Sequence, residues 1–240
     1  MKTLEGRNAL VTGASRGIGA AAARALAATG AHCICTARSK AALEELDDEI
    51  RGAGGTATLV PLNLRHDAKI DALGPSLFER FGKLDIFVSA AGLLGPLSPL
   101  HHIADADFTN VMQVMVHAQW RLMRTLTPLL AQSDDGRAIV VVCAAGQNPK
   151  AYWSPYASAD AARSAMAISW AHELAASGVK VNLFDPGAVA TKLRAKAYPG
   201  EDEKTITQPD QLADAFVALA APTLTATATR FTYPELPPIS

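Results

Sequence analysis

The chain has 240 residues, of which 49% are hydrophobic and 19% are charged, so it is long enough to bury a large core. Its 22 basic and 23 acidic residues give a formal charge of -1, which excludes a broad electrostatic attraction to nucleic acid or anionic membranes. No apolar run approaches the roughly 18 residues of a membrane span, and the start MKTLEGRNALVTG lacks a signal-peptide pattern. We therefore expect a single cytoplasmic domain over residues 1–240, with no nucleic-acid or membrane partner.

Short apolar or β-branched runs alternate along the chain with stretches at helical spacing. The runs predict strands at 8–13, 32–37, 57–62, 84–90, 138–143 and 179–184, and the stretches between them predict helices at 18–29, 40–53, 67–81, 105–130 and 156–177. Near-continuous apolar strands separated by helices predict a parallel sheet with helices on both faces. This is the α/β, doubly wound, Rossmann-type architecture, whose ligand site lies at the carboxyl ends of the strands.

Two segments depart from this alternation. Residues 192–207, KLRAKAYPGEDEKTIT, are rich in charge and contain a Pro-Gly turn, which is typical of a flap over a site. The tail at 225–240 contains three prolines among its last seven residues, so we expect it to be extended.

The first predicted strand leads into the glycine-rich stretch TGASRGIG, at 12–19, and then directly into an alanine-rich helix. Glycines allow phosphate groups to approach the main chain, and the free N–H groups at a helix start bind a pyrophosphate. This GxxxGxG spacing between a strand and a helix indicates a dinucleotide-binding loop rather than a plain turn.

The sequence resembles the short-chain dehydrogenase/reductase family, whose glycine motif is TGxxxGxG. In chain order, SAAG at 89–92 stands where the family has NNAG, YASAD at 156–160 stands where it has YxxxK, and DPGAVATKL at 185–193 contains its PG motif followed by threonine. The resemblance implies an NAD(P)-dependent oxidoreductase acting on a carbonyl or alcohol. It places the cofactor on Gly13, Ser15, Arg16, Gly17, Ile18, Gly19, Arg38, Asn63, Leu64, Ala90, Ala91, Gly92, Pro186, Gly187, Val189 and Thr191.

The end of the second predicted strand indicates which cofactor form the chain prefers. Family members that use NAD commonly have an acidic residue there, whereas this chain has Thr36-Ala37-Arg38. Arg38 and Arg16 are suited to bind a 2'-phosphate through charge-assisted hydrogen bonds, so we expect NADP(H) rather than NAD(H). The alternative is that both arginines are ordinary solvated side chains. The cofactor residues named above form the cofactor cradle. Two substitutions indicate that this cradle is weakened: Asn63 in place of the usual aspartate and Ala90 in place of the second NNAG asparagine.

The four catalytic positions implied by the resemblance are largely substituted. Tyr156 matches the family's acid-base tyrosine, but Cys143 stands at the serine, Met115 at the relay asparagine and Asp160 at the lysine. A thiol is a weaker hydrogen-bond donor than a hydroxyl, and a thioether carries no proton. The resemblance is therefore to a member with a degenerate catalytic tetrad.

Asp160 is the substitution with the largest expected effect on the chemistry. Two unit charges about 4 Å apart interact by roughly 1 kcal/mol in water and roughly 4 kcal/mol at an effective dielectric constant of 20. A carboxylate in place of the lysine therefore opposes the ionisation of Tyr156 that the family lysine favours. Lys150, in the segment between Cys143 and Tyr156, is the best candidate for a replacement cation, although an exposed loop lysine is normally only solvated.

Three functions remain open from the sequence: an impaired NADP(H)-dependent oxidoreductase, a non-catalytic dinucleotide-binding sensor or partner subunit, and a scaffold without a ligand. The substrate cannot be identified from residues 192–207. The small residues of the helix that follows Tyr156 permit close packing, and the matching helix commonly forms a subunit interface in this family, so we expect a homodimer or homotetramer.

Overall fold

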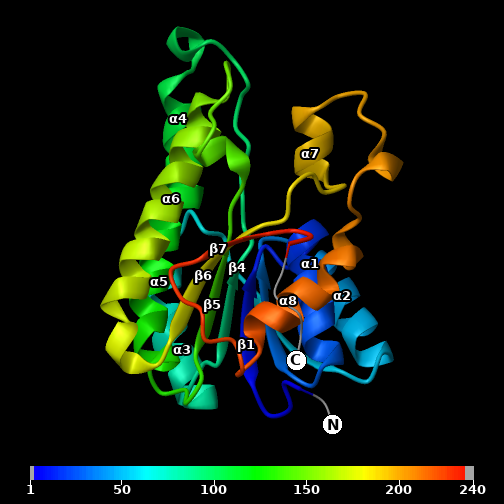
Figure 1. Cartoon of the computed structure of the whole chain (residues 1–240), viewed down its shortest axis with the longest axis vertical. Coiled ribbons are helices and arrows are strands. Elements are labelled where there is room, and N and C mark those ends of the chain that lie inside the picture. The colour runs from blue at the N-terminus through cyan, green and yellow to red at the C-terminus, as the bar shows by residue number, and fades with distance from the viewer. Residues whose placement is uncertain (1–2, 236–240) are drawn as a thin grey trace.

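Seven parallel strands form the centre of the structure, a computed structural model that describes residues 3–235 (Figure 1). The strands are β1 (Asn8–Thr12), β2 (His32–Ala37), β3 (Thr56–Pro61), β4 (Ile86–Ser89), β5 (Arg137–Val141), β6 (Lys180–Asp185) and β7 (Arg230–Thr232). Their order across the sheet is β3-β2-β1-β4-β5-β6-β7, and every neighbouring pair is parallel. The order changes direction between β1 and β4, which is where a doubly wound sheet binds ligands.

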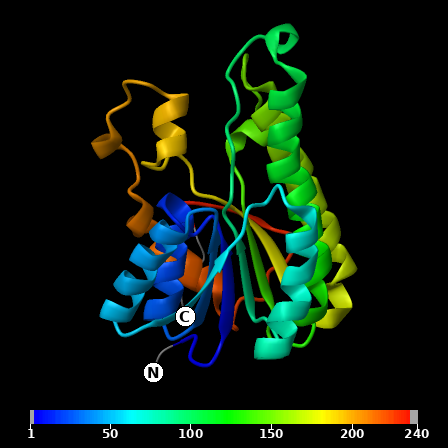
Figure 2. The same ribbon diagram turned by 180° about the vertical axis from the view of Figure 1, so that it is seen from behind.

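Helices cover both faces of the sheet (Figures 1 and 2). On one face lie α1 (Gly17–Ala28), α2 (Lys40–Gly52) and α8 (Ala213–Ala220), and on the other lie α3 (Asp67–Phe81), α5 (Ala118–Leu130) and α6 (Ser154–Glu173). Two shorter helices, α4 (Asp105–Met112) and α7 (Lys192–Ala197), lie beyond the carboxyl ends of the strands (Figure 1). The predicted α/β, doubly wound fold is confirmed.

Alternation along the central strands explains why the sheet is covered twice. In β2, Cys33 and Cys35 pack into the core with α1, α2 and α8, whereas Ile34 between them packs into the core with α3, α5 and α6. Successive strand residues point to opposite faces, so a strand that is apolar at every position needs helices on both sides. Burial raises the pKa of both thiols, which therefore act as small core side chains.

The elements differ from the predictions mainly near the site. The helix predicted at 156–177 begins at Ser154 and ends at Glu173, so Tyr156 lies in its first turn. The helix predicted at 105–130 contains a π-helical turn at Gln113–His117, between α4 and α5.

The last third of the chain contains elements that the sequence did not predict. The predicted flap contains α7 and a short 3-10 turn at Glu203–Thr205. The helix α8 was not predicted, and the tail contributes the edge strand β7. Residues 236–240 of the predicted tail lie outside the described residues.

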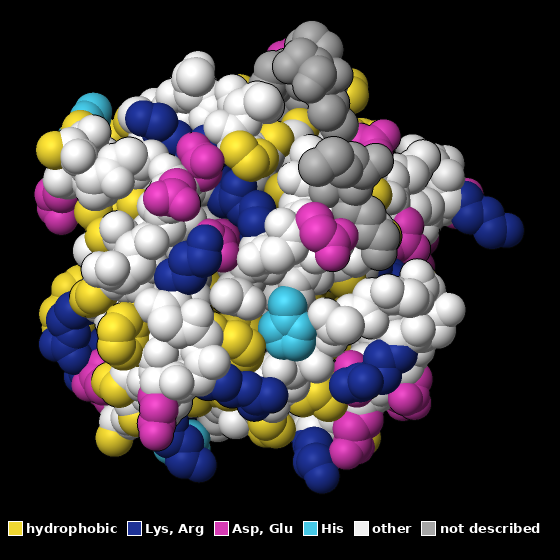
Figure 3. Space-filling view, turned by 90° about the horizontal axis from the view of Figure 1, so that it is seen from below, with side chains coloured by type: hydrophobic (Ala, Val, Ile, Leu, Met, Phe, Trp, Pro, Cys, Tyr) yellow, Lys and Arg dark blue, Asp and Glu magenta, His cyan; other side chains and the backbone are white. Residues whose placement is uncertain are grey.

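Charges of both signs are interspersed over the face seen from below (Figure 3). This distribution agrees with the near balance of basic and acidic residues in the whole chain. Within residues 3–235, no helix has both the length and the apolar character needed to span a membrane.

Candidate active site

The glycine-rich loop joins β1 to α1 at the carboxyl edge of the sheet and contains Gly13, Ser15, Arg16, Gly17, Ile18 and Gly19. Gly13 has a φ of +69°, and a Cβ there would lie 2.9 Å from the main chain of Ala91. A Cβ on Gly19 would lie 2.4 Å from the carbonyl oxygen of Gly13. The turn is therefore folded so tightly against itself and the loop after β4 that only glycine fits at these two positions.

Thr12 connects this loop to the segment after β4. Its buried hydroxyl accepts hydrogen bonds from the main-chain N–H groups of Ala90, at 3.2 Å, and Ala91, at 3.3 Å. Thr12 thus links two of the segments predicted to hold the cofactor. Sequence reasoning placed Thr12 in the glycine motif but gave it no function, because its partners lie almost eighty residues further along the chain.

The other predicted cofactor residues lie along the same edge. Arg38 follows β2, Asn63 and Leu64 follow β3, Ala90 to Gly92 follow β4, and Pro186 and Gly187 follow β6. Thr191 caps α7, and its Cγ2 lies 3.2 Å from where a Cβ on Gly17 would be, so the start of the flap touches the glycine loop. Val189 forms an isolated bridge with Thr207. The fold therefore brings segments from five strands and the flap to one edge.

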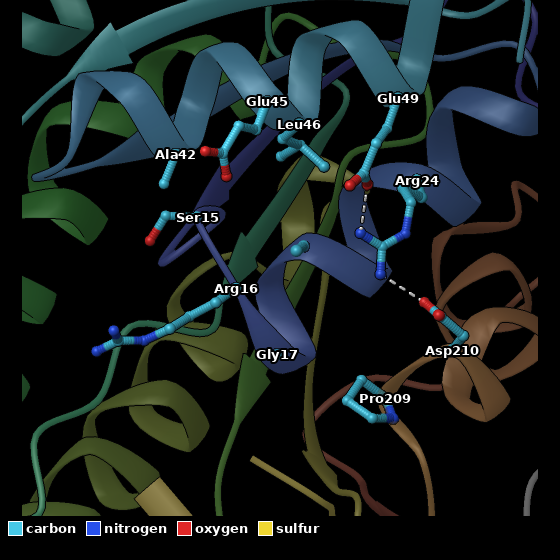
Figure 4. A pocket seen from close by; sticks show the side chains of 11 residues that line it. Ser15, Arg16, Gly17, Arg24, Ala42, Glu45, Leu46, Glu49, Pro209 and Asp210 are labelled. Atoms are coloured by element: carbon cyan, nitrogen blue, oxygen red, sulfur yellow. Dashed lines mark hydrogen bonds and ion pairs between the residues drawn. The ribbon is translucent and has the colours of Figure 1, made fainter. Parts of the chain in front are cut away.

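A cavity of about 260 Å³ lies beside this loop, between α1, α2 and the turn at 209–210 (Figure 4). Arg24 crosses it, bonded to Glu49 at 2.9 Å and Asp210 at 2.6 Å. Glu45 and Arg16 also line the cavity, with the guanidinium end of Arg16 pointing away from Arg24 (Figure 4). A phosphate would meet carboxylates in this cavity, and the charge of Arg24 is already paired. The cavity is therefore a poor site for a dinucleotide phosphate.

Arg38 and Arg16 are more suitable for a phosphate. Arg38 is exposed directly after β2, and neither arginine has an ion-pair partner within residues 3–235. Arg16 is part of the glycine turn, and Arg38 lies two residues after Thr36, whose carbonyl oxygen accepts from the N–H of Ala14 in that turn. The N-terminus of α1 presents main-chain N–H groups there that no capping side chain occupies. The cradle therefore fits a dinucleotide on two counts: glycines that admit no side chain, and two available guanidinium groups.

The structure brings all four predicted catalytic positions together. Cys143 follows the end of β5, and its main-chain N–H donates to Oδ2 of Asp160 at 3.1 Å. Met115 lies in the π-helical turn and packs with Ala159 and Tyr156. Met115 is 1% exposed, so it acts as a core side chain at the position of the family's relay asparagine.

The charges around Tyr156 oppose its ionisation. Burial raises the pKa of the Tyr156 phenol, and the neighbouring Cys143 and Asp160 raise it further, while Arg163 acts in the opposite direction. Burial also raises the pKa of Cys143, again with a contribution from Asp160. The Tyr156 phenol therefore stays protonated near neutral pH, as the sign of the charge on Asp160 predicted.

Burial raises the pKa of Asp160 itself, against the attraction of Arg163 and the hydrogen bond from Cys143. Asp160 is only 1% exposed, and its Oδ1 has no hydrogen-bond partner among the described residues. A carboxylate held in this way is expensive to ionise. Asp160 therefore acts as a buried structural side chain that holds the N–H of Cys143, rather than as a solvated group.

Arg163 is the residue of this site that sequence reasoning missed. It is 4% exposed and donates to the carbonyl oxygens of Ser89, at 3.2 Å, and Ala91, at 3.3 Å. Its spacing was an available signal, because positions 156, 160 and 163 are four and seven residues apart and lie on one face of a helix. A cation thus lies one turn beyond the family's lysine position.

The proposed replacement cation, Lys150, is engaged elsewhere. Its Nζ lies 3.3 Å from the hydroxyl of Tyr198 in the flap. Trp153 lies between the two tyrosines, with ring centroids 6.0 Å from Tyr156 and 5.6 Å from Tyr198. Arg194 stacks on Tyr198 at 3.6 Å and is held by two hydrogen bonds to Glu201. An aromatic and cationic cluster therefore joins the flap to the segment beside the catalytic tyrosine.

Comparison with known proteins identifies the family of this chain. Residues 7–202, well over half of the chain, match the family model described as short chain dehydrogenase. The chain belongs to this family. It is 32% identical over 209 residues to the uncharacterized oxidoreductase YciK of Escherichia coli K12, covering 86% of this chain and 82% of that protein. Among the most similar curated relatives, the match covers from 66% to 91% of the relative's own length.

Solved structures of the family share the whole fold. A structure from Pseudomonas syringae assigned to the short chain dehydrogenases has 35% identity and a TM-score of 0.93, with 96% of each chain covered. A Shigella flexneri 2a structure assigned to the same family and complexed with NADP has 29% identity and a TM-score of 0.92, with 96% of this chain and 98% of the other covered. This chain therefore has both the sequence pattern and the complete fold of the short-chain dehydrogenases.

Proposed function

We propose that this chain binds NADP(H) and reduces a carbonyl compound slowly, with Tyr156 as the proton donor. The observation that carries the proposal is the position of Tyr156, in the first turn of α6 and at the same edge of the sheet as a glycine loop in which Gly13 and Gly19 admit no Cβ. When bound, the cofactor supplies the hydride. The substrate beyond a small carbonyl or alcohol stays open.

The roles of the residues follow from their chemistry. Tyr156 donates its proton to the oxygen of the substrate, and Cys143 is the nearby donor that the family provides as a serine. A thiol donates weakly, so Cys143 polarises a carbonyl less than a hydroxyl does. The raised pKa of Tyr156 makes the phenol a weaker acid, so proton donation to a substrate oxygen is slow, and the protonated group cannot abstract a proton from an alcohol.

The preference for NADP(H) rests on Arg16 and Arg38. Neither arginine has an ion-pair partner among the described residues, and no carboxylate stands at the end of β2 to repel a 2'-phosphate. The Shigella flexneri relative complexed with NADP supports the same choice.

A non-catalytic dinucleotide-binding protein is the second candidate. Asp160 at the lysine position favours it, because this carboxyl is buried beside Tyr156 and raises the pKa of the phenol. Met115 favours it as well, since a buried thioether relays no proton. In this reading the chain acts as a sensor or as a partner subunit that responds to the bound nucleotide.

The test begins with titration of the purified protein by NADPH and NADH, followed by a panel of ketones and aldehydes. We expect tighter binding of NADPH and turnover close to the background rate. Tyr156→Phe should remove whatever turnover exists and leave binding intact, whereas Tyr152→Phe, at an exposed neighbouring tyrosine, should change neither. Binding of NADPH without any turnover identifies the second candidate, and binding of neither nucleotide overturns both.

We also propose that the chain self-associates through α6. A broad cavity of about 680 Å³ lies beside this helix, and the α6 residues that line it are small or apolar except for His172: Ala161, Ser164, Ala165, Ile168 and Ser169. Small residues let a second helix approach closely, and a symmetric pair of such faces forms a closed dimer. Sedimentation at micromolar concentration that shows only a 25.1 kDa species contradicts this proposal.

A further inference from the structure

Two buried charged side chains of α6 hold the ends of two different strands. Asp160 is 1% exposed and Arg163 is 4% exposed. Asp160 accepts a hydrogen bond from the first residues after β5, and Arg163 donates to the last residue of β4 and the loop that follows. Long charged side chains are rarely buried this fully unless they are paired, so both positions need a physical reason.

The contact of Asp160 fixes the turn after β5. Its Oδ2 accepts from the N–H of Cys143 at 3.1 Å. The same oxygen lies 2.6 Å from where a Cβ on Gly146 would be, so the 3-10 turn at Ala144–Gly146 packs directly on this carboxyl group. A lysine at position 160 has no acceptor for the N–H of Cys143 and brings a longer side chain into the same space.

Arg163 and Thr12 both hold the segment after β4. Thr12 accepts from the N–H groups of Ala90 and Ala91, while Arg163 donates to the carbonyl oxygens of Ser89 and Ala91. The main chain of three consecutive residues is thus held through both its donors and its acceptors. A Cβ on Gly13 would lie 2.9 Å from Ala91, so this segment also forms a wall of the glycine loop.

We propose that Asp160 and Arg163 form a clamp, in which Arg163 is a positioning residue for the cofactor cradle and Asp160 is a positioning residue for the turn that carries Cys143. The proposal deepens the proposed function and rests on it for the part that concerns the cofactor. At the position of the family's lysine, the clamp has a buried carboxyl group that accepts a hydrogen bond from the N–H of Cys143. Arg163 attracts Asp160 electrostatically, but the two side chains form no ion pair within residues 3–235, so each is held by its own main-chain partners.

The first test compares Arg163→Met with Arg137→Met. Arg137 is a matched control, because it is 2% exposed and also donates to main-chain carbonyl oxygens, those of Ala221, Gly136 and Pro222, but lies at the amino end of β5. We expect both variants to melt at lower temperature than the unmodified chain. Only Arg163→Met should weaken NADPH binding, by about tenfold, the amount that hydrogen bonds from a charged group contribute. Equal NADPH affinity in all three proteins overturns the clamp.

A measurement without nucleotide separates failure of the clamp from failure of the proposed function. Hydrogen exchange of peptides covering residues 86–95 should speed up in Arg163→Met and stay unchanged in Arg137→Met. If the unmodified chain binds no NADPH, the proposed function fails while this exchange result still decides the clamp. Unchanged exchange at 86–95 in Arg163→Met overturns it. Arg163→Lys, which keeps the charge but loses the paired geometry, should be intermediate and serves if Arg163→Met does not fold.

The second test uses position 160, where a degraded site and a clamp predict different results. Asp160→Lys restores the family residue, so a degraded site should bind NADPH more tightly. The clamp predicts no gain in NADPH affinity, and faster hydrogen exchange of residues 142–148, because the N–H of Cys143 loses its acceptor. Asp160→Asn keeps an acceptor oxygen for Cys143 and should bind NADPH within about twofold of the unmodified chain. Tighter binding by Asp160→Lys overturns the clamp.

Discussion

The cofactor half of the site is held mainly by main-chain contacts, whereas its catalytic half is held mainly by side-chain contacts. Around β1, α1 and the end of β4 the contacts are mostly main chain, with Gly13 and Gly19 packed against carbonyl and Cα atoms. Around β5 and α6 the contacts are side chains, at Cys143, Tyr156 and Asp160. The cofactor half retains the family's glycine motif, whereas the catalytic half retains only the tyrosine of the family's four catalytic residues.

This difference shows which constraints the fold itself imposes. A glycine whose Cβ would overlap the main chain cannot be replaced without moving a strand or a helix. A catalytic side chain is exchangeable when its replacement fits the same space and finds partners, as Met115 does in the core and Asp160 does on the N–H of Cys143. The glycine motif is therefore a reliable sign of the fold, whereas the catalytic positions must be considered one at a time.

The largest expected effect comes from filling the space at Gly19. A Cβ there would lie 2.4 Å from the carbonyl oxygen of Gly13, so Gly19→Ala should displace the loop, abolish dinucleotide binding and lower the melting temperature. Gly52→Ala is the control, because no heavy atom lies within 4 Å of its Cβ position and alanine is the better helix former by about 1 kcal/mol. If Gly19→Ala binds NADPH like the unmodified chain, the main-chain account of the cofactor half is wrong.

The next effect concerns a side chain of the cofactor half. Arg38→Ala should weaken NADPH binding by about 1.5 to 3 kcal/mol, the contribution of hydrogen bonds to a charged group, and leave NADH binding unchanged. Arg51→Ala is the matched control, since Arg51 is exposed and paired with Asp47 within α2. Isothermal titration with both nucleotides measures the preference. Equal affinities of the unmodified chain for NADPH and NADH would remove the basis for a phosphate site at Arg38.

A smaller effect is expected in the catalytic half. Cys143→Ser exchanges a weak thiol donor for a hydroxyl, so any carbonyl reduction should increase by a few fold, while Asp160 continues to oppose ionisation of Tyr156. Cys35→Ser is the control, because it changes a buried thiol of β2 and should lower stability without raising the rate. Steady-state rates with NADPH and a reactive aldehyde give the comparison, and a rate that falls in Cys143→Ser would assign the thiol an active role.

Much of the fold was predictable because its signals are local. Apolar runs, helical spacing and the glycine motif located the first six strands and the five longest helices. The edge strand β7 was missed because only three residues, Arg230–Thr232, pair with β6, and the pairing joins residues more than forty positions apart. The π-helical turn at Gln113–His117 was missed because an i to i+5 hydrogen bond leaves no periodic pattern in the sequence.

The candidate site was predictable only where the family resemblance supplied positions. Cys143, Met115, Tyr156 and Asp160 were found by counting along the motifs, and the fold brings them together. Arg163 was missed because its acceptors, Ser89 and Ala91, lie more than seventy residues away in sequence. A lone arginine in a helix is usually solvated, so burial had to be observed before its function was apparent.

The smallest expected effect is a change of thermal stability with pH, which compares Asp160 with a second buried aspartate, Asp85. Asp85 lies directly before β4, at the other end of the sheet. Burial raises the pKa of Asp160. Burial also opposes ionisation of Asp85, but hydrogen bonds from Ser133 and from the N–H of Asn8, together with Lys83, outweigh it and lower the pKa of that carboxyl. Both side chains are at most 2% exposed. The two carboxyl groups therefore affect stability in opposite ways as the pH changes.

For Asp160, the native state binds the proton more tightly than the unfolded state does. Its ionisation thus lowers stability progressively as the pH rises from the ordinary pKa of an aspartate, about 3.9, through the raised native pKa. Asp160→Asn should therefore melt higher than the unmodified chain at pH 7, and the gap should close as the pH falls towards 4. Each unit of pKa displacement corresponds to about 1.4 kcal/mol.

For Asp85, the stabilisation is present above the ordinary pKa and is lost as the pH falls through the lowered native value. Asp85→Asn should therefore melt lower than the unmodified chain at pH 7, with a gap that narrows in acid. Thermal unfolding of the three proteins between pH 4 and pH 8 measures both gaps. If Asp160→Asn instead melts lower at pH 7, ionised Asp160 stabilises the fold. The attraction of Arg163 then outweighs the cost of burial, and charge stabilises the catalytic half much as main-chain packing stabilises the cofactor half.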